Sequence, residues 1–326
     1  MYRPLVTIII PVYNGANFLA EAIDSALQQV YDNIEVIVIN DGSTDNGETE
    51  RIALSYGEKI RYLYKQNGGV SSALNIAIKH SNGEWISWLS HDDLYFPNKI
   101  SRQIDFINEL INKHKDINLD LIAIHSATVS IDKNGKIIKI PSYSNVDIVE
   151  NSKDVILKNI YNYRLSGCSF LLPKKAFFQI GFFNENIRTV SDVEYWYRLV
   201  FNGYQFYCLK NDRLVKNRSH GKQVGKTKIE LFNEELIDLY NKIFDNYYQI
   251  FKPQIRDIKT FYFGMIKRGF KSVAKRIRTT TIKIATNPID YYIFLPLCSC
   301  FWAIIGKTRD FCKHIFRYIF VYRKKN

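Results

Sequence analysis

Cysteine is scarce in this chain of 326 residues, and its five cysteines are scattered along the sequence. Only Cys298 and Cys300 lie close together, and no Cys or His pair stands nearby at the spacing of a zinc site. This usage argues against a disulfide framework and favours reduced thiols in a cytosolic compartment. The sequence also shows no basic segment followed by an apolar stretch and a cleavage site, so we expect no secretory signal.

Long uninterrupted apolar runs are missing as well. The most apolar stretch, residues 289–305, is broken by Pro296 and falls short of the roughly 20 residues that a spanning helix needs. A hydrophobic share of 46% and a mean hydropathy of -0.19 indicate a folded protein, neither disordered nor crossing a membrane many times.

Acidic residues are rare at one end of the chain. Residues 246–326 contain 17 Lys and Arg against 3 Asp and Glu, whereas residues 1–245 contain 28 against 29. Because these cations are interleaved with Phe, Ile and Val, we expect residues 226–326 to be a largely helical, basic region on an anionic membrane surface. An ordinary packed helical subdomain and a re-entrant or short spanning segment at 289–305 are the alternatives. No recognised nucleic-acid-binding motif accompanies the charge, so no nucleic-acid partner is expected.

Strand and helix patterns alternate over the first 125 residues. Short apolar runs predict strands at 6–12, 34–40, 60–65, 85–89 and 121–129. Apolar residues at helical spacing predict helices at 18–29, 49–56, 70–80 and 97–112, and further helices at 174–180 and 191–202. The alternation predicts an α/β fold with a doubly wound, mostly parallel sheet, in a domain covering residues 1–225. Ligands of such sheets bind beyond the carboxyl ends of the strands.

Carboxylates follow two of the predicted strands. Asp41, in INDGSTDN, can accept hydrogen bonds from a base or ribose, or can serve as an ordinary helix cap. Asp92 and Asp93, in WLSHDDLY, are adjacent, so they repel each other unless a cation or a donor compensates. Mg²⁺ or Mn²⁺ typically takes one or two carboxylates together with phosphate oxygens. A solvated acidic turn is the alternative for this pair.

Four further polar positions are candidates. Asn67 begins an Asn-Gly-Gly turn before a helix, where backbone amides can meet phosphate or base, and Asn75 is polar on that otherwise apolar helix. Asp192 begins the helical segment 191–202, either as a general base for an acceptor hydroxyl or as a helix cap. His220, in a basic turn, is a candidate for binding metal or diphosphate, or is simply exposed.

Five segments in this order resemble the family 2 inverting glycosyltransferases of the GT-A fold. They are TIIIPVYNGANFLAEAIDSALQQ, VINDGSTDN, NGGVSSALNIAI, WLSHDDLYFPNKI and SDVEYWYRL, and a sixth, weaker one is RSHGKQVGK. Together they span about residues 5–225. The ordered agreement of so many short motifs is specific, although each motif alone is not.

The resemblance implies roles for the nucleotide-binding residues. Pro11, Tyr13 and Asn14 would border the nucleotide of a nucleotide-sugar donor, and Asp41 would bind the base, often uracil. Asp92 would meet the ribose or the metal.

The resemblance also implies the residues of the metal site and of catalysis. Asp93 would coordinate Mn²⁺ or Mg²⁺ bridging the diphosphate, with His220 near the metal and phosphates. Asp192 would deprotonate the acceptor for a single displacement with inversion. Ser90 replaces the first Asp of a D-x-D-D pattern, and Leu74 stands where an Arg is frequent. Neither departure removes the expected base Asp192, but both leave the identity of the sugar donor undetermined.

The expected protein is therefore a hexosyltransferase-like enzyme of surface-polysaccharide assembly. It would transfer a sugar from a nucleotide-diphosphate sugar, with a UDP-sugar as the favoured donor. The acceptor would be a glycan or lipid-linked saccharide at the inner face of the cell membrane. One alternative, motivated by Ser90 and Leu74, is an inactive membrane-associated protein that binds sugar nucleotides. The other is a nucleotidyltransferase, whose usual Gly-rich, Lys/Arg-bearing N-terminal loop is absent.

Overall fold

The computed structural model describes residues 1–140, 148–150, 155–157, 165–221, 223, 227–251 and 255–284. The chain divides into two compact units, Met1–Lys252 and Pro253–Asn326. Helix α9 (Ile229–Phe251) belongs to the first unit. The apolar stretch 289–305 and the basic segment after it lie outside the described residues.

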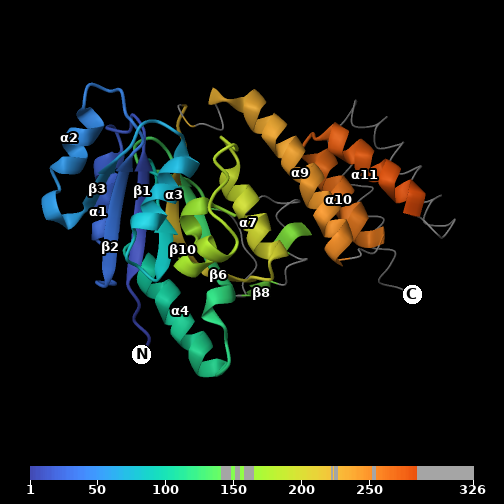
Figure 1. Ribbon diagram of the computed structural model, residues 1–326, viewed down its shortest axis with the longest axis horizontal. Helices are drawn as coiled ribbons and strands as arrows, with labels where there is room; N and C mark the ends of the chain where they lie inside the picture. Colours follow the sequence, from blue (N-terminus) through green and yellow to red (C-terminus); the bar gives the residue numbers. More distant parts are fainter. Residues whose placement is uncertain are drawn as a thin grey trace. The chain divides into compact units, whose positions relative to one another are not determined.

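The first unit contains a five-stranded sheet in the order β3-β2-β1-β4-β9. Its strands are β1 (Val6–Val12), β2 (Ile34–Asn40), β3 (Arg61–Tyr64), β4 (Trp85–Trp88) and β9 (Leu172–Pro173). Strands β3, β2, β1 and β4 run parallel, and β9 is antiparallel to β4. Figure 1 shows β1, β2 and β3 side by side. The predicted mostly parallel sheet is confirmed.

Strand β1 lies at the centre of this sheet, and all seven of its residues are buried. Alternate side chains Val6, Ile8 and Ile10 join a core with helix α1 (Leu19–Leu27) and helix α4 (Lys99–Lys113). The opposite face is covered by α3 (Val70–His80), while α2 (Glu48–Leu54) packs beside α1. Because both faces are covered, the strand reads as a continuous apolar run.

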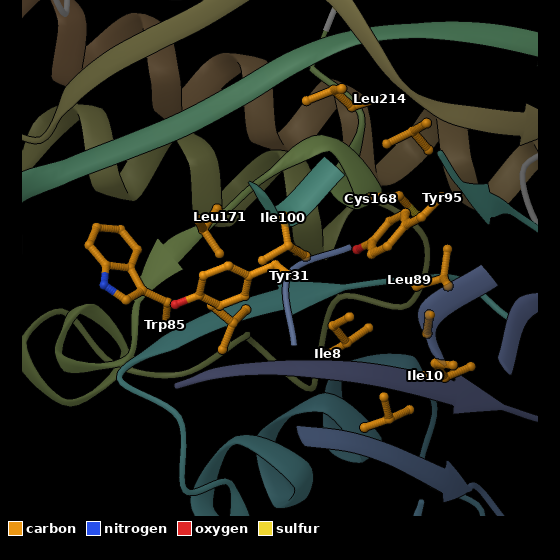
Figure 2. Packing of buried hydrophobic residues seen from close by; sticks show 14 of the residues in the cluster. Ile8, Ile10, Tyr31, Trp85, Leu89, Tyr95, Ile100, Cys168, Leu171 and Leu214 are labelled. Atoms are coloured by element: carbon orange, nitrogen blue, oxygen red, sulfur yellow. The ribbon is translucent and has the colours of Figure 1, made fainter. Parts of the chain in front are cut away.

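The core continues from this sheet toward the neighbouring loops (Figure 2). Ile8, Trp85 and Ile100 pack there with Tyr31 and Tyr95, all at most 8% exposed. The two tyrosine hydroxyls have polar partners: Tyr31 donates to the carbonyl of Pro4 at 2.6 Å, and Tyr95 to that of Trp88 at 2.7 Å. Their hydrogen bonds offset the cost of burying the hydroxyls.

A second sheet has the order β5-β10-β6-β7, with β8 also paired to β10. Its strands are β5 (Leu94–Tyr95), β6 (Ile122–Ile131), β7 (Ile137–Lys139), β8 (Ile148–Glu150) and β10 (Gln205–Arg218). The sequence pattern does not predict β10, because the charged residues Asp212 and Arg213 interrupt its apolar positions. The pairing of β10 with β6 is irregular at this same place, between Leu209 and Val215.

Strand β10 matters for function because of where it ends. It pairs antiparallel with β5 through Val215 and Tyr95, and through Lys216 and Leu94. This pairing brings the end of β10 beside the loop that follows β4. Helices α6 (Lys174–Gln179) and α7 (Ser191–Phe201) lie between β9 and β10 in the chain. Three single-turn helices complete the described elements: Gly57–Lys59, Leu119–Leu121 and Gly167–Ser169.

The described part of the second unit is a pair of helices, α10 (Ile255–Lys267) and α11 (Lys271–Ile284), that contact each other. Most of their apolar residues are buried: Ile258, Phe261, Tyr262, Met265, Val273, Ala274 and Ile277. Lys267, Lys271 and Lys275 are exposed. Residues 255–284 thus have packed apolar positions, as in the helical subdomain named above as an alternative, and binding of the C-terminal region to a membrane stays a prediction. Among the described helices, none has the length and apolar character needed to cross a bilayer.

Lys99, at the start of α4, is fully buried. Its ammonium donates to Ser87 Oγ at 2.8 Å and to Gln103 Oε1 at 2.9 Å, and lies 4.4 Å from the centre of the Tyr95 ring. Burial lowers the pKa of Lys99 to about 7. Between this pKa and the ordinary lysine value of about 10.4, the unfolded chain binds more protons than the folded one. The free energy of unfolding should therefore rise with pH by about 1.4 kcal/mol per pH unit.

Replacing this ammonium by an apolar group should remove its contribution to the pH dependence. For Lys99→Met we expect the slope of the free energy of unfolding between about pH 7.5 and pH 9 to be lower than that of the parent chain by about 1.4 kcal/mol per pH unit. Urea unfolding at both pH values measures the slope. Lys113→Met, an exposed change on the same helix, is the matched control and should keep the slope of the parent chain. An unchanged slope in Lys99→Met would contradict the assignment.

Candidate active site

The loops carrying the predicted residues meet at one edge of the first sheet. Tyr13 and Asn14 follow β1, Asp41 follows β2, and Asp92 and Asp93 follow β4. Because these strands are parallel neighbours, their carboxyl ends share an edge. The backbone N–H of Asp41 donates to the carbonyl of Val12 at 2.8 Å, which ties the first two loops together.

The loop after β1 has one exposed and one fixed residue. Tyr13 is 46% exposed, whereas Pro11, shortly before it in the chain, is buried within β1. Asn14 adopts a left-handed backbone, with φ of 50°. Its N–H donates to Ser43 Oγ at 2.9 Å, and its side-chain oxygen accepts from the N–H of Thr44 at 2.7 Å. Asn14 thus fixes the two loops relative to each other.

Asp41 organises the Gly-Gly turn before α3. Its carboxylate accepts from Lys65 Nζ at 2.6 Å, from the N–H of Gly68 at 2.9 Å and from that of Gly69 at 2.8 Å. The amide of Asn67 donates to the backbone carbonyl of Asp41 at 2.9 Å. A base entering this site would meet the turn that Asp41 holds. Direct contact of Asp41 or Asn67 with a base stays a prediction.

Asn75 lies on α3, and its side chain is hydrogen-bonded to the loop that precedes α7. Its side-chain oxygen accepts from the N–H of Phe183, and its amide donates to the carbonyl of Phe183 and to Glu185 Oε1, all at 2.9 Å. The side chain is 4% exposed. Its observed role is to hold the loop 181–190 that leads to α7, and nucleotide contact by Asn75 stays a prediction.

Asp92 and Asp93 face different surroundings. Asp93 is buried, and its two oxygens accept from the N–H of Arg218 at 2.7 Å and from Cys168 Sγ at 3.3 Å. Burial, and then the charge of Asp92, raise the pKa of Asp93 to about 7. Asp92 instead contacts His220, with 2.8 Å between Oδ2 and Nε2, and both side chains are 14% exposed.

Arg218, at the end of β10, was not singled out from the sequence, although it begins the RSH segment. Its buried guanidinium donates to the carbonyls of Asp92 and Lys133 at 2.8 Å and to Glu21 Oε2 at 2.7 Å. It also lies 4.4 Å from the centre of the Phe18 ring. One side chain therefore joins the loops after β4 and β6 to α1, and it precedes His220 by two residues.

Asp92 and His220 together suit part of a metal site. Within the described ranges, no three His, Cys, Asp or Glu side chains are grouped to hold a metal ion by themselves. A cation bound by Asp92 and His220 would need phosphate oxygens of a bound nucleotide to complete its ligands. Carboxylate and phosphate oxygens are the usual ligands of Mg²⁺ and Mn²⁺, and His220 would add a nitrogen ligand to that set. Coordination by Asp93 stays a prediction, since both of its oxygens already have partners.

Asp192 is the second residue of α7 and is partly exposed. Burial of its carboxyl raises its pKa to about 6. The N–H of Val193 donates to Oδ1 at 2.8 Å, and this hydrogen bond lowers the pKa by a smaller amount. Among the described contacts, none joins Asp192 to Asp41, Asp92 or Asp93. Arg188, four residues earlier, donates to the carbonyl of Gly68. Arg188 thus ties the loop before α7 to the turn that Asp41 holds, and a place for Asp192 at the same edge stays a prediction.

Known protein sequences identify the family. The profile described as "Glycosyl transferase family 2" matches residues 7–176. An uncharacterized glycosyltransferase of Rickettsia conorii is 48% identical over 72% of this chain, which covers 37% of that protein. One of Rickettsia prowazekii is 43% identical over 74% of this chain and 72% of its own length. The minor teichoic acid biosynthesis protein GgaB of Bacillus subtilis is 28% identical over 81% of this chain and 29% of its own length. This chain spans about a third of the length of three of its rickettsial relatives.

Solved structures with the same fold include two glycosyltransferases. TarS of S. aureus in complex with UDP-GlcNAc has a TM-score of 0.59 and 17% identity, over 80% of this chain and 71% of TarS. The mannosyltransferase PcManGT of Pyrobaculum calidifontis, with GDP-Man and Mn²⁺, has a TM-score of 0.54 and 15% identity, over 92% and 81%. Both confirm the expected GT-A fold. With a family profile over more than half of its length and glycosyltransferases among its relatives, this chain belongs to glycosyl transferase family 2.

Proposed function

We propose that this chain transfers a sugar from a UDP-sugar to a hydroxyl of a glycan or lipid-linked saccharide, with inversion at the anomeric carbon. The observation that carries the proposal is the meeting of three features at one sheet edge. They are the turn held by Asp41, the pair Asp92 and His220, and the loop that leads to Asp192. The first two features follow parallel strands, at the edge where ligands of such sheets bind, and Arg188 links the third to the Asp41-held turn.

Two known proteins support the donor class. TarS was solved with UDP-GlcNAc, and PcManGT with GDP-Man and Mn²⁺. Both donors are nucleoside-diphosphate sugars, which fits an edge that offers the Asp41-held turn and a carboxylate–imidazole pair. The acceptor class follows from GgaB, a teichoic acid biosynthesis protein, by analogy only.

The mechanism we propose assigns each step to a residue of this chain. Asp192 accepts the proton of the acceptor hydroxyl while that oxygen attacks the anomeric carbon and the bond to the leaving diphosphate breaks. A raised pKa near 6 makes Asp192 a stronger base than an ordinary aspartate, yet leaves it mostly ionised above pH 7. Asp92 and His220 would hold a Mn²⁺ or Mg²⁺ ion, which supplies charge neutralisation for the leaving diphosphate. Arg218 holds the backbone of Asp92 and precedes His220 by two residues in the chain.

Release of the nucleotide tests the proposal. The protein is incubated with UDP-, GDP- and dTDP-sugars, with Mn²⁺, with Mg²⁺ or with EDTA, and the free nucleotide and pyrophosphate are measured. We expect metal-dependent release of UDP that increases when a saccharide acceptor is added. Nucleotide binding without turnover would favour the inactive binding protein, and release of pyrophosphate would favour a nucleotidyltransferase.

We further propose that the basic C-terminal region holds the protein on an anionic membrane surface. Its charge supports this, with 17 basic against 3 acidic residues in 246–326, as does the exposure of Lys267, Lys271 and Lys275. Because most apolar residues of α10 and α11 are buried, this part would bind by charge and not by insertion.

Vesicle sedimentation measures this binding. The triple change of Lys267, Lys271 and Lys275 to Gln should weaken binding to phosphatidylserine vesicles by up to about 100-fold, at about 1 kcal/mol per lysine. Lys113→Gln, in the first unit, should leave binding unchanged. Equal binding of the triple variant and the parent chain would reject this role for α10 and α11.

A further inference from the structure

We propose that Arg188 binds the diphosphate of the sugar donor, an inference that rests on the proposed function. Arg188 lies in the loop 181–190 between α6 and α7, and its side chain is exposed. Its guanidinium donates to the carbonyl of Gly68 at 2.5 Å. A Cβ atom added to Gly69 would lie 2.9 Å from the same guanidinium nitrogen. The cation therefore rests directly on the Gly68–Gly69 turn.

The backbone of Arg188 is held in place from a distant helix. Glu235, on α9, accepts from the N–H of Arg188 at 2.7 Å and from the N–H of Thr189 at 2.8 Å, one with each carboxylate oxygen. The second oxygen also accepts from the hydroxyl of Thr189 at 2.6 Å. At the other end of the loop, Asn75 holds Phe183 through its side-chain oxygen and amide. A loop fixed at both ends presents its cation at little entropic cost on binding.

Arg188 keeps most of its hydrogen-bonding capacity available. A guanidinium has five N–H donors. Among the described residues, that of Arg188 makes one hydrogen bond, to Gly68, and no ion pair. The neighbouring cation, Lys65, is instead paired with Asp41 at 2.6 Å. Arg188 is thus the cation of this turn whose charge is not balanced by a described carboxylate.

The chemistry that matches such a cation is a phosphate group. Arg binds phosphate oxygens with two parallel N–H bonds, and such charge-assisted bonds are about twice as strong as neutral ones. Arg188 contacts the Asp41-held turn, where the nucleotide is proposed to bind, and precedes the proposed base Asp192 by four residues in the chain. In a nucleotide-sugar the diphosphate links the nucleoside to the sugar, so we expect a donor whose nucleoside lies against this turn to meet the guanidinium with its diphosphate.

Binding of UDP compared with uridine tests this assignment. Isothermal titration in the presence of Mn²⁺ should show that Arg188→Ala weakens UDP binding by about tenfold or more. Uridine, which lacks phosphates, should bind the variant and the parent chain equally. Arg188→Lys should recover part of the UDP affinity, because it restores the charge but not the planar fork. Arg51→Ala, an exposed change on α2, is the matched control and should bind UDP normally.

The outcomes separate this proposal from the proposed function. If the parent chain releases UDP from a UDP-sugar while Arg188→Ala binds UDP as tightly as the parent, only the role of Arg188 is overturned. An equal loss of UDP and uridine affinity would also overturn it, since that result indicates a damaged loop. If the parent chain binds no UDP in the presence of Mn²⁺, the UDP-sugar function and the role of Arg188 are both rejected.

Discussion

Asp192→Asn is expected to lower kcat for sugar transfer by about 1,000-fold, while the KM for the donor changes by less than about threefold. Positioned general bases contribute about 10² to 10⁴ in rate, and an amide cannot accept the acceptor proton. The change keeps the size of the side chain, and its carbonyl oxygen can still accept from the N–H of Val193. Fold and donor binding should therefore survive. Steady-state kinetics with a saccharide acceptor measure both constants.

The pH profile gives an independent check on the same residue. A base works in its ionised form, so kcat/KM should fall as pH is lowered through the raised pKa of Asp192, about 6. An ordinary aspartate would place this fall near pH 4. In Asp192→Asn, the remaining kcat/KM should no longer fall as pH is lowered through about 6.

Asp105→Asn, an exposed change on α4, is the control for this pair of measurements and should retain both the rate and the profile. An Asp192→Asn variant with more than about a tenth of the parent rate would rule out Asp192 as the base.

The second large effect is expected at the metal pair. Asp92→Asn should reduce metal-dependent transfer by about 100-fold or more and raise the Mn²⁺ concentration for half-maximal rate. Removing the charged oxygen weakens the cation that neutralises the leaving diphosphate. His220→Gln should act in the same direction. Because Asp92 and His220 contact each other at 2.8 Å, the double variant should lose less than the product of the two single losses.

Asp93→Asn separates two roles for the neighbouring carboxylate. As a metal ligand, the role implied by the family resemblance, Asp93 would share the metal dependence of Asp92. As a group that only holds Arg218 and Cys168, it would affect thermal stability and leave the Mn²⁺ requirement unchanged. Measuring the melting temperature and the Mn²⁺ titration on the same variant decides between them. If Asp92→Asn kept the parent Mn²⁺ requirement, the proposed metal pair would be wrong.

Many residues of the candidate site could be predicted, because the carboxyl ends of parallel strands lie at the same edge of a sheet. The apolar runs at β1 and β2, and the amphipathic repeat of α3, were sufficient to locate these elements. Asp41 directly follows β2 and Asp92 lies in the loop after β4, so their meeting at one edge follows from strand direction.

Other features depend on contacts between residues far apart in the chain. Strand β10 has charged residues within it, and its pairing with β6 and β5 decides its course. Arg218 meets Glu21, 197 residues away, and Asp92, 126 residues away. Such a contact cannot be predicted from a local sequence pattern, because the register and order of the strands determine which residues meet.

The amino-acid sequence by itself determined that this chain folds as alternating strands and helices, with aspartates following two of its parallel strands. That information is local, since it lies in periodicity and in the residue that follows each strand. The tertiary structure alone decided which partners those side chains have. It turned Asp93 toward Arg218, joined Asp92 to His220, and set Arg188 on the turn held by Asp41. These choices follow from packing between distant segments, where burial and hydrogen-bond satisfaction select one arrangement.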